Sequence, residues 1–240
     1  VLRVWEIQVD GPHIDEWPPV GHDALYGKLT PQDLSAEVIN NRLTRFAMLA
    51  FRRPPIEGEL QPILDMVQYK LKEGLSPLES LQLGFQTILS APGFLYLNEG
   101  EGELDDFTLA SRLSYFLWSS MPDAELFELA EQGKLKDTGV LRGQVERMLS
   151  DPKSKRLTSN FLRVWLELDN IGKMPPSREF ISFYRDNLES AMRKETELLF
   201  ENILNKNLPP RELLSANYSF INRELAEHYG ISGLEGNEFR

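Results

Sequence analysis

The stretch LASRLSYFLWSS, residues 109–120, decides how the rest of the chain is interpreted. It carries a single charge, Arg112, in a chain whose residues are 26% charged. Wound as a helix over 107–119, it places an apolar stripe beside a face of small side chains that includes Ala110 and Ser114. A helix without a polar face is typical of the interior of a protein. We therefore predict that this helix is buried on all sides.

Arg112 then lies in or near the core, where a guanidinium needs a partner to offset the loss of hydration. Its planar fork suits a carboxylate that accepts two hydrogen bonds. We predict a structural ion pair between Arg112 and Glu195, because Glu195 lies on the apolar side of the long helix expected over 181–206. Asp123 is the local alternative partner. An anion-binding pocket around Arg112 is the functional alternative.

Helical patterns continue on both sides of this stretch. From Thr30 onward, apolar residues recur at helical spacing between signals that start and stop helices. SPLE at 76–79 is a capping box with proline at the first helical position, and Asp105 or Asp106 caps helix 107–119. We predict an all-α fold, a bundle-like array of about eight to ten helices.

The first thirty residues have a different character. VLRVWEIQVD at 1–10 alternates as a short strand does, and GPHIDEWPPVGHDALYG at 11–27 is a linker rich in proline and glycine. We expect residues 1–30 to be the tail of a preceding domain plus a linker. Residues 31–100 then form a first helical domain, and residues 101–240 form a second.

Composition excludes several classes of function. Asp and Glu number 37 against 26 Lys and Arg, a net charge of −11, which argues against a nucleic-acid partner because phosphate binding needs clustered cations. No apolar run approaches the roughly 18–20 residues that a membrane span needs. The absence of cysteine excludes thiol nucleophiles, iron–sulfur clusters and covalently bound haem in this chain. We expect no cofactor here. Because the sequence begins at Val1 rather than Met, we read it as part of a larger protein.

Few residues suggest binding or catalysis. His13 and His22 lie in the linker among acids, but no spacing typical of a metal site occurs, so we predict no metal. Trp17 is the best candidate for stacking on a sugar, whereas Trp118 and Trp165 follow helical stripes and are predicted to be core. His13, His22 and Trp17 are thus the candidates for ligand contact. Carboxylates at 195, 197 and 201 offer pairs such as a glycosidase uses.

Several long strings carry a resemblance to known proteins. They are FAMLAFRRPP (46–55), ILSAPGFLYLNE (88–99), LASRLSYFLWSSMPDAELFELAEQGKL (109–135), LRGQVERMLSDPKSKRL (141–157) and FINRELAEHYGI (220–231). Together they resemble two consecutive helical domains of unknown function, over about 36–99 and 107–230. Such domains occur in large planctomycete proteins that often carry a cytochrome c-like domain. The resemblance implies an exported protein, periplasmic or on the cell surface, with further domains on both sides and any haem on a separate domain.

The residues and the resemblance together favour a structural and interaction scaffold. It would position neighbouring domains of the same chain, among them a haem domain. A polysaccharide-active enzyme using the carboxylates near 195–201 and a carbohydrate-binding module using Trp17 are the alternatives.

Overall fold

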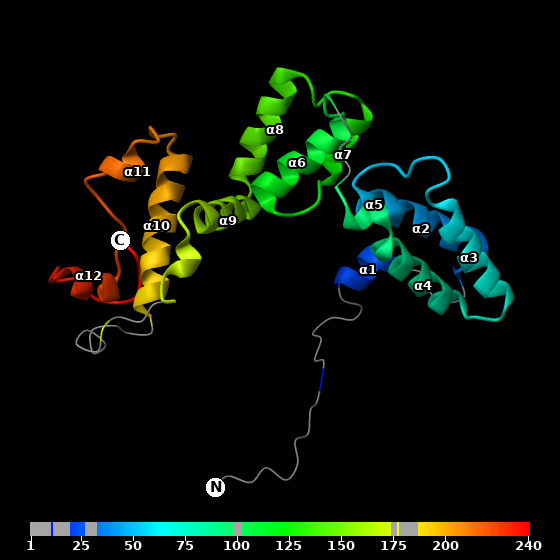
Figure 1. Ribbon diagram of the computed structural model, residues 1–240, viewed down its shortest axis with the longest axis horizontal. Coiled ribbons are helices and arrows are strands. Elements are labelled where there is room, and N and C mark those ends of the chain that lie inside the picture. Colours follow the sequence, from blue (N-terminus) through cyan, green and yellow to red (C-terminus); the bar gives the residue numbers. More distant parts are fainter. Residues whose placement is uncertain (1–10, 12–19, 27–32, 98–101, 174–176, 178–186) are drawn as a thin grey trace, which may run out of the picture. The chain divides into compact units, whose positions relative to one another are not determined.

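The computed structural model describes residues 11, 20–26, 33–97, 102–173, 177 and 187–240 (Figure 1). Within these residues the regular structure is helical and no strand occurs, so the predicted all-α class is confirmed. The strand predicted at 1–10 lies outside the described residues, as do His13 and Trp17.

The chain divides into two compact units, Val1–Thr108 and Leu109–Arg240. The expected domain boundaries after residues 30 and 100 stay predictions. None of the described helices is long and apolar enough to cross a membrane.

In its described residues, the first unit contains five α-helices. Ser76 and Glu79 form the predicted capping box at the start of the fourth, with the Ser76 side chain bonded to the Glu79 backbone and the Glu79 side chain bonded back. Ser35 caps the second by accepting a hydrogen bond from Val38 N. The helices are α1 (Val20–Tyr26), α2 (Ala36–Phe51), α3 (Gln61–Lys72), α4 (Pro77–Ser90) and α5 (Pro92–Leu95).

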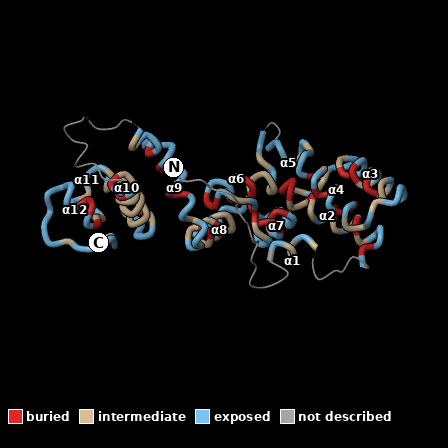
Figure 2. Tube along the Cα trace, turned by 90° about the horizontal axis from the view of Figure 1, so that it is seen from below, coloured by how far each residue is buried: buried red, intermediate tan, exposed pale blue. Residues whose placement is uncertain are grey.

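The apolar faces of α2, α3 and α4 make the core of this unit (Figure 2). The helices approach closely at Gly84 on α4, which faces the fully buried Leu43 of α2. A Cβ added at Gly84 would lie 2.5 Å from Leu43 Cδ2, closer than two carbon atoms can pack. Glycine at this position therefore sets the separation of the two helices.

The sequence RRPP at 52–55 ends α2 with a turn in which Arg52 is buried. Arg52 takes a left-handed conformation with φ of 61° and is buried. Its Nη2 donates to the carbonyl oxygens of Gly93, Phe94 and Tyr96 at 3.1, 3.2 and 3.4 Å. These carbonyls lie at the end of α5, where helices leave acceptors unpaired. The arginine thus ties the end of α2 to the end of α5.

The second unit contains the remaining helices. Asp105 accepts a hydrogen bond from Thr108 N at the start of α6, as predicted. The next helix begins after Asp123, whose side chain accepts a hydrogen bond from Leu126 N. The elements are α6 (Asp106–Trp118), α7 (Ala124–Glu131), α8 (Thr138–Ser150), the 3₁₀ turn η2 (Pro152–Ser154), α9 (Lys155–Trp165), the 3₁₀ turn η3 (Leu168–Asn170), α10 (Leu188–Asn205), α11 (Glu212–Ser215) and α12 (Arg223–Tyr229).

The contact between Gly84 and Leu43 generates a prediction. Gly84→Ala should lower the free energy of unfolding by about 1–3 kcal/mol, because the added methyl group overpacks a core with no room for it. Urea unfolding followed by circular dichroism measures the change.

The matched control is Gly143→Ala, since Gly143 also lies inside a helix but has no atom within 4 Å of its added Cβ. That variant should be neutral or more stable by up to about 1 kcal/mol, through helix propensity. Equal effects of the two substitutions would contradict the packing account.

Candidate binding groove

Helix α6 has a buried face and an exposed face, so the prediction that it is buried on all sides is wrong. Its buried residues are Ala110, Ser111, Ser114, Leu117 and Trp118. Arg112, Tyr115 and Phe116 are exposed. Sequence pattern misled here because leucine and aromatic side chains encircle the helix, whereas the small alanine and serine side chains mark the side that packs.

The expected burial of Arg112 is therefore wrong. Glu195 is engaged within its own end of the unit, where its carboxylate accepts hydrogen bonds from Ser219 Oγ at 2.5 Å and Tyr229 OH at 2.7 Å. Burial and the bond to Glu195 raise the pKa of Tyr229 to about 12. The Arg112–Glu195 ion pair itself stays a prediction, but its premise of a buried guanidinium no longer holds.

Among the described residues, Trp118 is the largest of the fully buried side chains, with 1% of its surface exposed, as its predicted core position requires. Its indole Nε1 donates to the carbonyl oxygen of Met148 on α8 at 2.9 Å. Two cations lie over its ring, Lys153 Nζ at 4.5 Å and Arg147 Cζ at 5.5 Å from the centroid. Arg156 Nη1 donates to the Trp118 carbonyl oxygen at 3.1 Å. Through its indole and its carbonyl oxygen, this one residue thus connects α6, α8, η2 and α9.

Arg147 joins this cluster to the start of α7. Its Nη1 and Nη2 donate to the two carboxylate oxygens of Asp123 at 2.7 and 3.2 Å, and its Nε donates to Gln144 at 2.9 Å. Gln144 in turn donates to Glu125 at 2.7 Å. Burial would raise the pKa of Asp123, but the hydrogen bonds from Arg147 and from Leu126 N outweigh it and leave the pKa below its usual value. Asp123, the alternative partner for Arg112, is therefore the partner of Arg147.

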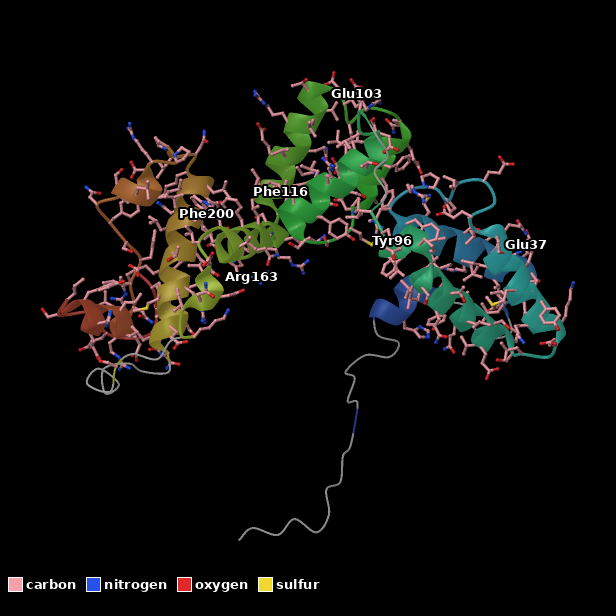
Figure 3. The ribbon with its side chains drawn as sticks, viewed as in Figure 1. Glu37, Tyr96, Glu103, Phe116, Arg163 and Phe200 are labelled. Atoms are coloured by element: carbon pink, nitrogen blue, oxygen red, sulfur yellow. The ribbon has the colours of Figure 1, made fainter. Side chains whose placement is uncertain are left out.

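An apolar groove of about 450 Å³ lies between α6 and α9, and we call it the aromatic groove. Phe161 and Trp165 stack on each other with ring centroids 5.3 Å apart, and Phe161 also contacts Phe200 of α10 at 5.7 Å. Figure 3 labels Phe116 on α6, Arg163 on α9 and Phe200 on α10. The groove is lined by Tyr115, Phe116, Ser119, Leu157, Asn160, Phe161, Val164 and Trp165.

The side chains of this groove are exposed to an extent unusual for apolar residues. Trp165 is 53% exposed and Val164 is 70% exposed, so the predicted core position of Trp165 is wrong. A contiguous exposed apolar patch of this kind marks an interaction site more often than scattered single residues do. The lining contains no carboxylate and no histidine, so it offers binding and no acid–base chemistry.

One end of the groove is fixed by a strained turn. Ser119, which follows α6, takes a left-handed conformation with φ of 49°, rare for a residue with a side chain. Its hydroxyl accepts a hydrogen bond from Asn160 Nδ2 of α9 at 2.7 Å. This bond and the one from Arg156 to Trp118 hold α9 against the end of α6. The groove is thus built by the same contacts that enclose Trp118.

The helix that forms one wall of the groove is basic in an acidic chain. Residues 152–165 contain four cations and no acid, while the whole chain has a net charge of −11. All four cations are exposed. Such a local reversal of charge favours a partner surface that is acidic. The four are Lys153, Lys155, Arg156 and Arg163.

The other residues singled out by the sequence do not converge. His22 packs against Tyr26 in the first unit, with ring centroids 4.8 Å apart. Lys194 pairs with Glu197 at 3.1 Å and lies 3.9 Å from Glu201, so these two carboxylates share a cation. In the part of the chain that the structure describes, no group of three or more His, Asp or Glu side chains is placed to hold a metal ion.

Comparison with known families agrees with this division of the chain. The family model PSD4, described as a protein of unknown function (DUF1592), matches residues 104–231, more than half of the chain. The chain belongs to the DUF1592 family. A second model, PSD5, described as a protein of unknown function (DUF1595), matches residues 39–99. The predicted pairing of two consecutive domains of unknown function is confirmed. No curated protein and no solved structure matches the chain.

The DUF1592 match contains the whole aromatic groove and the cluster around Trp118. The DUF1595 match contains most of the three-helix core and the Arg52 turn of the first unit. Sequence reasoning missed the groove because it assigned every aromatic on a helical stripe to the core. The four cations between residues 152 and 165, with no acid among them, were the signal that could have marked α9 as exposed.

The ion pair of Asp123 generates a prediction about pH. Asp123→Asn keeps an oxygen to cap α7 but removes the charge that Arg147 binds. At pH 7 the free energy of unfolding should fall by about 1 kcal/mol, a value reduced by partial exposure to solvent. Because the folded pKa of Asp123 is lowered, its contribution is present above the unfolded pKa of about 3.9 and is lost as the pH falls through the folded pKa.

Urea unfolding of the two proteins at pH 7 and pH 3 measures this effect. The difference in stability between wild type and Asp123→Asn should shrink toward pH 3. A difference that stays constant or grows would show that the Asp123–Arg147 pair does not stabilise the folded unit.

Proposed function

We propose that this chain is an interaction module within a larger protein, and that the aromatic groove is its contact surface for a neighbouring domain. The observation that carries the proposal is the exposure of Trp165, Val164 and Phe116 on a groove that belongs to a firmly bonded part of the unit. Burying these side chains against a partner would stabilise the complex by about 25 cal/mol per Å² of apolar surface before the costs of association.

The chemistry of the groove limits what the partner is. Apolar and aromatic side chains line the groove, and the cations Lys155, Arg156 and Arg163 are exposed on α9, the helix that supplies five of the lining residues. A partner that fits carries apolar side chains surrounded by Asp and Glu. The favoured occupant is therefore an acidic surface or helix of a neighbouring domain, which the charges would orient and the aromatics would hold.

The wider setting rests on the resemblance alone. We propose that the full-length protein is exported, periplasmic or on the cell surface, and that a haem domain is among the domains this module positions. The planctomycete origin of the resemblance belongs to the same proposal. The proposal of an acidic partner surface does not depend on the resemblance, because it is based on the groove.

An enzymatic role has weaker support. The groove lining has no carboxylate, Glu195 is bonded to Ser219 and Tyr229, and Glu197 and Glu201 share Lys194. A glycosidase needs an acid and a base that face one sugar. Carbohydrate binding remains the second candidate for the groove, since aromatic faces next to Asn160 and Ser119 suit a sugar ring.

A single thiol tests the proposal, because the chain has no cysteine of its own. Val164→Cys places a thiol in the groove, and Leu214→Cys places a control thiol on an almost fully exposed residue of α11. The rate of maleimide labelling is measured by mass spectrometry of the corresponding peptides, in this chain alone and in the full-length protein.

The thiol at 164 should react at least tenfold more slowly in the full-length protein, while the thiol at 214 reacts equally in both. Equal rates at 164 in both proteins would rule out the groove as an internal contact surface. Slower labelling restored by about 0.5 M salt would support the acidic partner, because salt screens the pairing of exposed charges.

A further inference from the structure

A second hollow lies in the same unit, between α10, α12 and the last residues of the chain, with a volume of about 460 Å³. We call it the polar pocket. Figure 1 shows α12 beside α10, with the end of the chain between the same elements. The pocket is lined by Asn187, Ser190, Ala191, Lys194, Asn222, Glu224, Asn237 and Phe239.

The three walls are placed by regular features of the sequence. Residues 187, 190, 191 and 194 recur at helical spacing, so one stripe of α10 forms the first wall. Asn222 and Glu224 come from the start of α12. The third wall is the segment 236–240, where residues two apart, Asn237 and Phe239, line the pocket.

Backbone hydrogen bonds hold this third wall in place. Ile221 and Arg240 exchange two hydrogen bonds, from each N–H to the other's carbonyl oxygen, both at 3.1 Å. Arg223 N also donates to the Gly236 carbonyl oxygen at 3.1 Å. The segment therefore runs alongside the start of α12, and Phe239 packs on the small apolar core that contains Leu188 and Leu225. The pocket is formed before any ligand arrives.

The charges in the pocket are already compensated. Lys194 Nζ lies 3.1 Å from Glu197 and 3.9 Å from Glu201. Glu224, whose side chain is 9% exposed, lies 3.3 Å from Arg223 Nη2. Lys194 and Glu224 therefore need no charged ligand to balance them. An added phosphate or carboxylate would be repelled by Glu197, Glu201 and Glu224. The charge pattern therefore favours a neutral ligand.

Several polar side chains of the pocket, in contrast, have donors or acceptors that no protein group uses. Asn222 is 7% exposed, and its Oδ1 is used to accept from Leu225 N at 3.1 Å. Among the described residues, Asn222 Nδ2 donates to no protein acceptor and is open to solvent, so it can donate to a ligand. Asn187, Ser190 and Asn237 add further amide and hydroxyl groups around it.

We propose that the polar pocket binds one neutral saccharide unit. Adjacent sugar hydroxyls need donors and acceptors placed in pairs, which the amides of Asn222 and Asn237 and the carboxylate of Glu224 supply. Phe239 and Ala191 offer an apolar floor for the C–H face of the ring. The volume of about 460 Å³ lies within the range of small-molecule sites and leaves room for a sugar ring. The site is separate from the aromatic groove and does not depend on the proposed contact with a neighbouring domain.

An NMR titration of the ¹⁵N-labelled chain tests the proposal. The probes are glucose, galactose, mannose and N-acetylglucosamine, each up to about 50 mM, with glucuronic acid, glucosamine and glycine as charged comparisons. At least one neutral sugar should give saturable shifts in residues 187–194, 222–226 and 236–240. The charged probes should bind more weakly or not at all.

Three variants locate the binding. Asn237→Ala removes an exposed amide of the pocket and should weaken binding by about three- to tenfold, as the loss of one neutral hydrogen bond does. Trp165→Ala reports instead on sugar binding in the aromatic groove, and Leu214→Ala, at an almost fully exposed residue of α11 that lines neither hollow, is the matched control and should leave the affinity unchanged. An unchanged ¹⁵N spectrum away from the substituted residue shows that each variant is folded.

Three results would overturn the proposal. They are the absence of saturable shifts in the pocket with every neutral sugar, tighter binding of a charged probe than of any neutral sugar, and loss of sugar binding in Trp165→Ala but not in Asn237→Ala. The last result would place carbohydrate binding in the aromatic groove and leave the polar pocket without a ligand.

Discussion

The second unit depends on the enclosure of one indole. Trp118 ends α6, and its N–H has to find an acceptor once the ring is removed from water. The Met148 carbonyl oxygen near the end of α8 accepts from it at 2.9 Å and also accepts the hydrogen bond from Asp151 N that ends this helix. Arg147 and Lys153 then cover the ring, and Asp123 fixes Arg147 while it caps α7. Trp118 thus connects α6 directly to α8 and η2, and connects it to α7 through Arg147.

The aromatic groove is a consequence of the same arrangement. Because α6 packs through alanine, serine and Trp118, its larger side chains Tyr115 and Phe116 are left on the opposite side. Arg156 and Asn160 bond to Trp118 and Ser119 and so fix α9 beside that exposed side. Exposed aromatics held by a rigid base lose little conformational entropy on binding, which is what an interaction surface requires. The hydrogen bonds that enclose Trp118 therefore also position the side chains that line the aromatic groove.

The helical class and several helix ends were predictable, because caps and apolar spacing act locally. SPLE at 76–79 and Asp105 fixed their helix starts as the sequence predicts. The inward face of α6 was not predictable in this way. Apolar residues surround this helix, so their spacing does not determine which face packs against another helix. Arg112 and Trp165 were placed in the core on that ground, and both are exposed. The bonds of Arg147 to Asp123, 24 residues apart, depend on packing that no short motif encodes.

The central claim is that a fixed core around Trp118 presents an exposed groove for a neighbouring domain. Hydrogen exchange of the Trp118 and Trp165 indole N–H groups, in this chain alone and in the full-length protein, tests this claim most directly. In the chain alone the Trp118 indole should exchange only through unfolding of the unit, and the Trp165 indole should exchange rapidly. In the full-length protein the Trp165 indole should become protected as well. Rapid exchange at Trp118, or equal exchange at Trp165 in the two proteins, would contradict the account.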